Sequence, residues 1–212
     1  MTKKIVIILL CVAIVLISAC TNISKPKLAV VKASIINITL EYPDIITECV
    51  GVAIDNDGNI LTTAHIIKEE YDLDNISIYC NIKSVKYEAH IIAIDRQKDL
   101  ALIKCGCLIN SLITFIDKDL YVGEKIRVAV NTLNGGNDVE GVVINSNQKI
   151  SYTTYTRDLL SINANLSLGY SGSPVIDNKG YAVGIISAKK VNDNTTFFAI
   201  KSAEIIEFLE ER

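Results

Sequence analysis

A serine loop near the C-terminal end is the strongest candidate for chemistry in this sequence. Ser171 lies in the segment LSLGYSGSPVID, between Gly169 and Gly172, and Pro174 stops the loop. Glycines let the backbone turn tightly, so that successive N–H groups can point at one position beside the hydroxyl. Acyl transfer needs this combination of a nucleophile and donors for a carbonyl oxygen that becomes negative. A glycine-rich β-turn without chemistry is the alternative.

A serine nucleophile needs a neighbouring base, and the chain has 2 histidines. His65 ends the segment NILTTAH, after small and hydroxylated residues, where a side chain can be presented rather than buried. His90 occupies an alternating position in YEAHIIAID, which is typical of a residue on the surface or rim of a sheet. A single histidine often has a structural role, so His65 alone is compatible with either a base or a structural residue.

A carboxylate that orients the base is the third requirement of this chemistry. Asp99 directly precedes the apolar run LALIKC and could be held at the start of a strand. Asp95, four residues earlier, fits the spacing equally well. An acid at the head of a strand is usually a solvated boundary residue, so both candidates stay open on the residues alone.

The nucleophile elbow of α/β-hydrolases does not fit the serine loop. That motif reads GxSxG, and its histidine follows the serine in the chain. Here Ser173 stands where the second glycine is needed, and no histidine follows Ser171. This class of hydrolase is therefore excluded.

The elements that must position these residues are short strands. The chain is 50% hydrophobic and 6% aromatic, without tryptophan, and apolar runs rich in Ile and Val alternate with Asn, Asp and Gly turns. The runs are SIINITLEY, VGVAI, NILTTAHII, NISIYCNI, YEAHIIAID and DLALIKC, then KIRVAV, GVVINSN, ISYTTYT, LLSINA, SPVIDNKGYAVGIIS and TTFFAI. Two groups of six predict an all-β fold of two six-stranded antiparallel β-barrels, at about 31–115 and 116–200. The tail KSAEIIEFLEER predicts a short C-terminal helix over 201–212.

The N-terminal residues have the layout of an export signal. Lys3 and Lys4 precede an apolar run that ends at Cys20. The residues before Cys20 resemble the lipobox of bacterial lipoproteins. The resemblance implies a signal peptide over 1–19, a lipidated Cys20 that anchors the protein to a membrane, and a tether over 20–30. An uncleaved anchor is the alternative, but the apolar run is shorter than the roughly 20 residues that span a bilayer.

Charge and cysteines narrow the remaining classes. The net charge of -3 provides no basic field for phosphate backbones, so nucleic acid is not expected as a partner.

The cysteines could form disulfides if the protein is exported. The C-x-C pair Cys105 and Cys107 would share one face of a strand and could not easily bridge. A metal site at this C-x-C pair is not supported, because the sequence has no second pair of ligands at a suitable distance. Free thiols are therefore expected at Cys49, Cys80, Cys105 and Cys107, and no metal or other cofactor is expected.

The three chemical segments together resemble the trypsin-like serine peptidases with the chymotrypsin fold. DNDGNILTTAH, AIDRQKDLALIK and GYSGSPVID with GYAVGIIS are most similar to the bacterial HtrA/DegP-like branch, here without its PDZ domain. The resemblance covers nearly the whole chain after the signal. It implies a catalytic triad of His65, Asp99 and Ser171, an oxyanion hole formed by the N–H groups of Gly169 and Ser171, and Ser187 beside the buried acid and the substrate backbone. It favours Asp99 over Asp95.

The loop departs from the HtrA pattern at two positions. Tyr170 replaces the usual asparagine before the serine, and Ser173 replaces a glycine. A serine like Ser173 also occurs in the glutamyl endopeptidase and exfoliative-toxin branch, but the histidine that reads acidic side chains there has no counterpart. Asn165, six residues before Ser171, falls near the primary specificity pocket in related folds and implies a preference for small or apolar side chains.

The resemblance implies a serine endopeptidase that cleaves polypeptides, including unfolded ones, at the cell envelope or outside the cell. Two other hypotheses remain at this point. A protease-like lipoprotein with an impaired loop at Tyr170 would act as a protein-binding module. A zymogen-like enzyme would need a partner or assembly into a homo-oligomer before it becomes active.

Overall fold

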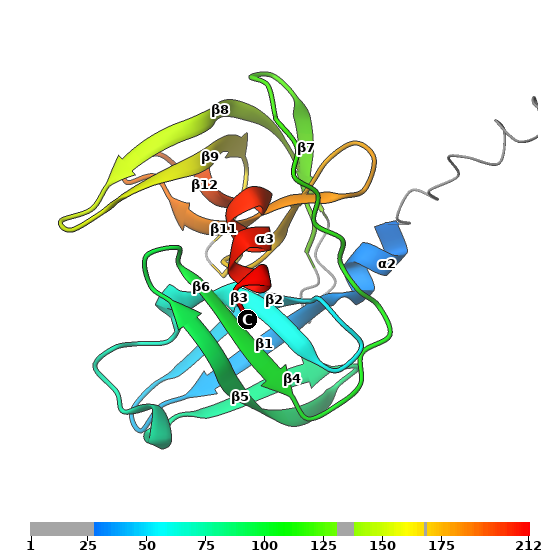
Figure 1. Ribbon diagram of the computed structural model, residues 1–212, viewed down its shortest axis with the longest axis vertical. Helices are drawn as coiled ribbons and strands as arrows, with labels where there is room; N and C mark the ends of the chain where they lie inside the picture. Colours follow the sequence, from blue (N-terminus) through cyan, green and yellow to red (C-terminus); the bar gives the residue numbers. More distant parts are fainter. Residues whose placement is uncertain (1–27, 131–137, 168) are drawn as a thin grey trace, which may run out of the picture.

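The first half of the chain folds into a closed antiparallel barrel (Figure 1). The computed structural model describes residues 28–130, 138–167 and 169–212. The strand order is β1-β2-β3-β6-β5-β4, and pairing between β1 and β4 closes the barrel. The strands are β1 (Ile35–Glu41), β2 (Ile46–Ala53), β3 (Asn59–Thr63), β4 (Ser77–Ile82), β5 (Val85–Asp95) and β6 (Leu100–Cys105).

The second half forms another closed barrel, with the order β10-β11-β12-β9-β8-β7 and closure between β10 and β7. Its strands are β7 (Lys125–Val128), β8 (Val139–Ser151), β9 (Thr156–Ala164), β10 (Pro174–Ile176), β11 (Ala182–Lys189) and β12 (Thr196–Lys201). The predicted fold of two six-stranded barrels and a C-terminal helix, α3 (Ser202–Glu210), is confirmed.

One run of the second barrel differs from the sequence-based assignment. ISYTTYT is not a strand, because Ser151 ends β8, Thr156 begins β9 and the residues between them form the hairpin tip. The run SPVIDNKGYAVGIIS forms the hairpin expected from its Asn178-Lys179-Gly180 turn, with β10 and β11 as its two strands. The Asp177 carboxylate accepts the N–H groups of Lys179 (2.8 Å) and Tyr181 (3.0 Å), which fixes that turn.

The hairpin between β2 and β3 shows how the sequence specifies a turn. The Asp55 carboxylate accepts the N–H groups of Asp57 (3.0 Å) and Asn59 (3.1 Å). Gly58 has φ of 87°, and a Cβ there would lie 2.4 Å from the carbonyl oxygen of Cys107. Only glycine fits this position, and the turn sends β3 back across the barrel toward His65.

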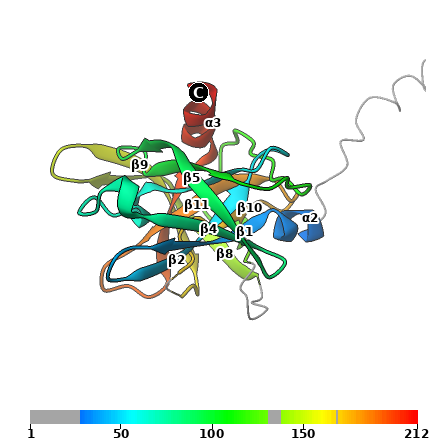
Figure 2. The same cartoon turned by 90° about the horizontal axis from the view of Figure 1, so that it is seen from below.

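A hydrophobic cluster joins the two barrels. It combines Leu61 and Leu100 of the first barrel with Leu159 and Ile185 of the second, all fully buried. Phe208 of α3 is in the same cluster, and Figure 2 shows α3 projecting from one side of the body. Burial of this surface ties the barrels together, so residues from both can form one site.

The segment before β1 contains a helix that the sequence analysis did not predict. Helix α2 (Leu28–Ala33) overlaps the expected tether, and Val31 is buried against the inter-barrel cluster. The expected signal peptide over 1–19 and Cys20 lie outside the described residues. Among the residues that the structure describes, no helix is long and apolar enough to cross a membrane.

Candidate active site

His65, Asp99 and Ser171 meet where the two barrels face each other. The His65 Nε2 lies 3.2 Å from the Ser171 Oγ, and the His65 Nδ1 lies 3.0 Å from the Asp99 Oδ2. His65 and Asp99 belong to the first barrel, whereas Ser171 lies in the loop between β9 and β10 of the second. These distances place one ring nitrogen within hydrogen-bond reach of the hydroxyl and the other within reach of the carboxylate.

His65 is held by a short 3₁₀ turn that follows β3, η1 (Ala64–Ile66). The Arg96 guanidinium donates to the carbonyl oxygens of Ala64 and Ile67, both at 2.6 Å, and so clamps the turn at each end. The Tyr42 hydroxyl donates to the Ile66 carbonyl oxygen at 2.7 Å. With its backbone fixed by these bonds, the His65 side chain remains 45% exposed and faces the junction of the barrels.

Asp99 precedes β6 in a left-handed conformation, with φ of 56°. Asp tolerates this region better than most residues, because its short polar side chain can bond locally. The Asp99 carboxylate accepts the His65 N–H at 2.8 Å, and the Asp99 carbonyl oxygen accepts the Ala64 N–H at 3.1 Å. The Asp95 carboxylate instead accepts the Lys98 N–H at 2.8 Å and holds the preceding turn. The geometry therefore places Asp99, rather than Asp95, beside the histidine.

The Asp99 carboxyl is 9% exposed, yet its surroundings favour the charged form. Burial by itself raises the pKa of Asp99. The hydrogen bond and charge of His65, the hydroxyl of Ser187 and the His65 backbone N–H oppose this effect and hold the pKa below its ordinary value. A carboxylate in this state can fix the ring tautomer of His65 and stabilise an imidazolium.

The loop that carries Ser171 is docked against the first barrel. Gly169 and Gly172 have φ of 93° and 86°, a region that favours glycine. The Val50 N–H donates to the Ser171 carbonyl oxygen at 3.2 Å, and the Gly172 N–H donates to the Ile186 carbonyl oxygen at 2.8 Å. A Cβ on Gly172 would lie 1.7 Å from the Val50 carbonyl oxygen. The close approach that positions Ser171 therefore requires glycine at 172.

The two departures from the HtrA pattern occupy different environments. The Tyr170 side chain is partly buried and packs against the core of the second barrel. Ser173 is fully buried, and its hydroxyl has no hydrogen-bond partner among the described residues. The Ser173 N–H donates to the Tyr170 carbonyl oxygen at 2.9 Å. This backbone bond supports the turn on which Ser171 lies.

A hollow of about 430 Å³ extends from His65 and Asp99 toward the tip of the β8–β9 hairpin. Ser187 and Ala188 of β11 line it, and the Ser187 hydroxyl donates to the Asp99 Oδ2 at 2.5 Å. Tyr152 and Tyr155, whose stacked rings have centroids 4.8 Å apart, line its outer side. The sequence-predicted position of Ser187 beside the acid agrees with this contact.

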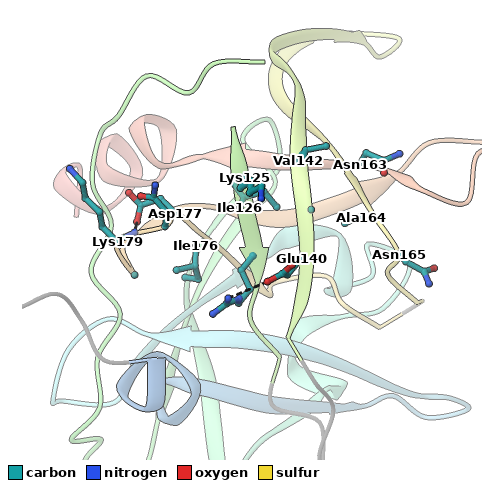
Figure 3. Close-up of a pocket in the computed structure, with 14 residues that line it drawn as sticks. Lys125, Ile126, Glu140, Val142, Asn163, Ala164, Asn165, Ile176, Asp177 and Lys179 are labelled. Atoms are coloured by element: carbon teal, nitrogen blue, oxygen red, sulfur yellow. Dashed lines mark hydrogen bonds and ion pairs between the residues drawn. The ribbon is translucent and has the colours of Figure 1, made fainter. Parts of the chain in front are cut away.

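Asn165 lies in a different pocket. That pocket has a volume of about 740 Å³ and is shown in Figure 3. Its lining includes Arg127 and Glu140, which pair at 3.5 Å. Strands β7 and β8, the end of β9 and the turn at Asp177 form its lining, which includes none of the three triad residues. The structure thus brings Ser187 to the triad, and it places Asn165 in the wall of the larger pocket.

The described cysteines are free thiols, as the sequence analysis expected. The sulfurs of Cys105 and Cys107 nevertheless lie 3.2 Å apart, because β6 ends at Cys105 and the chain bends before Cys107. The spacing had suggested that the two side chains lie apart on one face of a strand, and the structure differs from this expectation. Within 28–130, 138–167 and 169–212, no group of His, Cys, Asp and Glu residues could hold a metal ion.

Two arginines beside the triad were missed by sequence reasoning. Arg96 clamps the turn of His65, and Arg157 lies 3.7 Å from the Asp99 Oδ2. The sequence did contain an indication that Arg157 is buried. Arg157 lies two residues before Leu159, so both side chains point to the same, buried face of β9. A charged residue in a buried strand position usually has a partner of opposite charge. Arg96 has no comparable sequence signal, since it lies in the loop after β5.

Comparisons with solved structures agree with the two-barrel architecture. The crystal structure of the active form of the Rv3671c protease from Mycobacterium tuberculosis superimposes with a TM-score of 0.76 at 21% identity, over 89% of this chain and 84% of that chain. The inactive form gives a TM-score of 0.72 at 20% identity, over 89% and 93%. At these identities, the likeness concerns the fold.

Sequence relatives and a family model extend this result. Human serine protease HTRA4 is 25% identical over 167 residues, which are 76% of this chain and 34% of that protein. Serine protease Rv3671c of Mycobacterium tuberculosis is 23% identical over 194 residues, 86% and 47% respectively. The matches thus span between a third and a half of these relatives. Residues 49–185, more than half of the chain, match the family described as trypsin-like peptidase domain. The chain belongs to the trypsin-like peptidase domain family.

Proposed function

We propose that this protein is a serine endopeptidase that hydrolyses peptide bonds through an acyl-enzyme. The observation that carries the proposal is the continuous contact from Asp99 through His65 to Ser171, with 3.0 Å at one ring nitrogen and 3.2 Å at the other. The segments that supply these groups are 34 and 106 residues apart in the chain. Membership of a family of serine proteases supports the same conclusion.

The proposed reaction begins with the Ser171 hydroxyl. Its oxygen attacks the carbonyl carbon of the scissile bond while its proton passes to the His65 Nε2. Asp99 keeps the other ring nitrogen protonated and stabilises the imidazolium that forms. His65 then gives the proton to the departing amine, which leaves an ester on Ser171. Water, deprotonated by His65, hydrolyses this ester and restores the free enzyme.

The oxyanion of the tetrahedral intermediate needs fixed donors. We assign this role to the backbone N–H groups of Gly169 and Ser171, in agreement with the family resemblance. The left-handed conformation of Gly169 and the docking of the Ser171 carbonyl on Val50 support a preorganised loop. Such donors contribute without rearrangement during the reaction, and loss of one typically slows turnover by about 100 to 1,000-fold.

Polypeptides are the proposed substrates, with small or apolar residues near the scissile bond. In the hollow beside the triad, Tyr152, Tyr155 and Ala188 offer contacts to an apolar side chain, and the other lining residues are polar or charged. Glu69 and Arg96, which pair at 3.2 Å, lie on its first-barrel side.

The proposed location is the cell envelope, with the protein exported and held at a membrane by a lipidated Cys20. The motif around Cys20 and the short apolar run before it support this location. Incorporation of a radiolabelled fatty acid into the wild-type chain, and its loss in Cys20→Ser, would test the anchor separately from the catalytic chemistry.

Two assays test the proposed reaction. A fluorophosphonate probe should label the wild-type protein at Ser171 and leave Ser171→Ala unlabelled. Mass spectrometry of a peptide library should find cleaved products with the wild type alone. A binding module would be identified by a different result. The wild type would be folded, unlabelled and inactive, and both the wild type and Ser171→Ala would bind polypeptides. Labelling that appears only with a peptide activator would identify a zymogen-like enzyme.

A further inference from the structure

A buried arginine from the second barrel reaches the segment that carries Asp99. Arg157 lies near the start of β9, and its side chain is only 5% exposed. Its Nη2 donates to the carbonyl oxygen of Lys98 at 2.8 Å, and its Nη1 lies 3.7 Å from the Asp99 Oδ2. The Nε has no hydrogen-bond partner in the described part of the chain. The guanidinium therefore contacts Lys98 and Asp99, and its charge also acts on the partly buried carboxyl of Glu204.

The segment that Arg157 contacts has an unusual backbone. Asp99 has φ of 56°, in the left-handed region that residues other than glycine seldom adopt. A conformation of this kind persists when the surroundings hold it in place. The hydrogen bond from Arg157 to the Lys98 carbonyl acts on the peptide group that joins Lys98 to Asp99. It therefore restrains the backbone from which the Asp99 carboxylate projects toward His65.

Other contacts from the second half of the chain hold the same segment. The Lys98 ammonium pairs with Glu207 at 3.0 Å and Glu211 at 3.7 Å, near the end of α3. Ser187 of β11 donates to the Asp99 carboxylate. These groups contact only side chains, namely the Lys98 ammonium and the Asp99 carboxylate. Arg157 contacts both the backbone carbonyl of Lys98 and the carboxylate of Asp99. The flat guanidinium can do both at once because its donors diverge in one plane.

We propose that Arg157 is a positioning residue for the proposed peptidase reaction, which sets the Asp99 carboxylate against His65 by holding the Lys98 carbonyl and facing the Asp99 Oδ2. This inference rests on the proposed function. Arg157 reaches the reacting atoms only through Asp99 and His65. Arg157 also lines the hollow beside the triad, but its side chain is only 5% exposed, so we expect its loss to change that surface little and to affect mainly the partner of the base.

The test compares Arg157→Met, which removes charge and donors, with Arg157→Lys, which keeps the charge and one donor. Arg127→Met is the matched control, because Arg127 also lies in the second barrel but makes a surface ion pair with Glu140. We expect Arg157→Met to lower kcat and the rate of fluorophosphonate labelling by about 10 to 100-fold, with KM little changed. Arg157→Lys should recover part of the rate, and Arg127→Met should match the wild type.

A spectroscopic readout separates positioning from a general loss of stability. In protein labelled with 15N-histidine, the ring N–H of His65 that bonds to Asp99 should give a protected proton signal. His90→Gln leaves His65 as the remaining histidine and assigns the signal. We expect Arg157→Met to broaden or remove this signal in protein that circular dichroism shows to be folded. This readout needs no turnover, so it tests Arg157 even if the wild type cleaves nothing.

Either of two results would overturn the proposal. The first is a folded Arg157→Met protein with wild-type kcat and an unchanged His65 ring N–H signal. The second is an equal loss in Arg127→Met, which would make the effect nonspecific. If Arg157→Met does not fold, Arg157→Gln replaces it with the same expectations. An unlabelled wild type with an intact His65 signal would instead refute the proposed function and leave the positioning role standing.

Discussion

Ser187, on β11 of the second barrel, donates its hydroxyl at 2.5 Å to the carboxylate of Asp99, which precedes β6 of the first barrel. Both groups are buried. A hydrogen bond to a buried carboxylate stabilises its charged form, and here it also fixes one barrel relative to the other. The acid beside His65 is thus defined by residues of both barrels.

Removal of this hydroxyl should weaken the proposed catalysis. Ser187→Ala leaves Asp99 with one donor fewer, which raises the pKa of Asp99 and loosens its orientation. We expect kcat to fall by about 10 to 100-fold, because hydrogen bonds to charged groups contribute about 1.5–3 kcal/mol. Steady-state kinetics on a cleavable peptide measures the effect. Ser34→Ala, which removes a buried hydroxyl bonded to the Val31 carbonyl oxygen, should leave kcat unchanged.

The Asp99 carboxylate should also make stability depend on pH. Its pKa in the folded protein lies below the ordinary value, mainly because the bonds from His65 and Ser187 outweigh burial. The unfolded state therefore binds this proton more tightly, and the stabilisation is present above about pH 4 and lost as pH falls through the folded-state pKa. Urea unfolding should show a difference between wild type and Asp99→Asn that narrows between about pH 5 and pH 3. A constant difference would contradict this account.

Glycine at 172 should be essential for the fold of the serine loop. A Cβ there would lie 1.7 Å from the Val50 carbonyl oxygen, so Gly172→Ala must displace the loop or β2. We expect a loss of more than about 3 kcal/mol in the free energy of unfolding and no fluorophosphonate labelling. Gly123 is the matched control, since it has φ of 87° but no atom within 4 Å of an added Cβ. Gly123→Ala should cost only about 1–2 kcal/mol and keep the labelling.

Substitution of Ser173 should stabilise the protein, in contrast to Gly172→Ala. Its hydroxyl is fully buried and has no hydrogen-bond partner in the part of the chain that the structure describes. A buried polar group without a partner keeps its full desolvation cost. Ser173→Ala should therefore raise the free energy of unfolding by about 1 kcal/mol and leave the labelling rate unchanged. Chemical denaturation measures the first quantity, and a lower stability would show that the hydroxyl has a partner.

The cysteines of the first barrel should resist alkylation in the native state. Burial raises the pKa of Cys49 to about 12, and burial with a bond to Cys105 raises the pKa of Cys107 to about 11. Because the thiolate is the reactive form, iodoacetamide at about pH 8 should modify the folded protein slowly and the urea-unfolded protein quickly. Mass spectrometry counts the modified sites. Rapid modification of native Cys49 would show that the first barrel opens.

The sequence predicted the fold because strand runs and turns have local signals. Gly58 and the Asp55 carboxylate specify a turn within a few residues, and the Ser171 loop contains its own glycines. The choice between Asp95 and Asp99 has no such local signal. It depends on the left-handed backbone of Asp99 and on the second barrel, which contacts that residue from 88 positions away at Ser187.

The elements that were missed depend on distant contacts in the same way. Helix α2 is short and lacks an N-terminal acidic residue, and it is held by burial of Val31 against the inter-barrel cluster. Asn165 lies on the wall of the larger pocket, and its expected part in substrate preference stays a prediction. Such positions follow from the packing of whole barrels and cannot be derived from residue spacing.

The ion pairs of Lys98 with α3 have a consequence for the order of synthesis. Glu207 and Glu211 follow Ser171 in the chain, and they pair with Lys98, the residue next to Asp99. β11 and β12, which complete the second barrel, also follow Ser171 in the chain. A nascent chain can therefore contain all three triad residues long before it can assemble them. Assembly of the triad is therefore expected to wait until α3 has been synthesised.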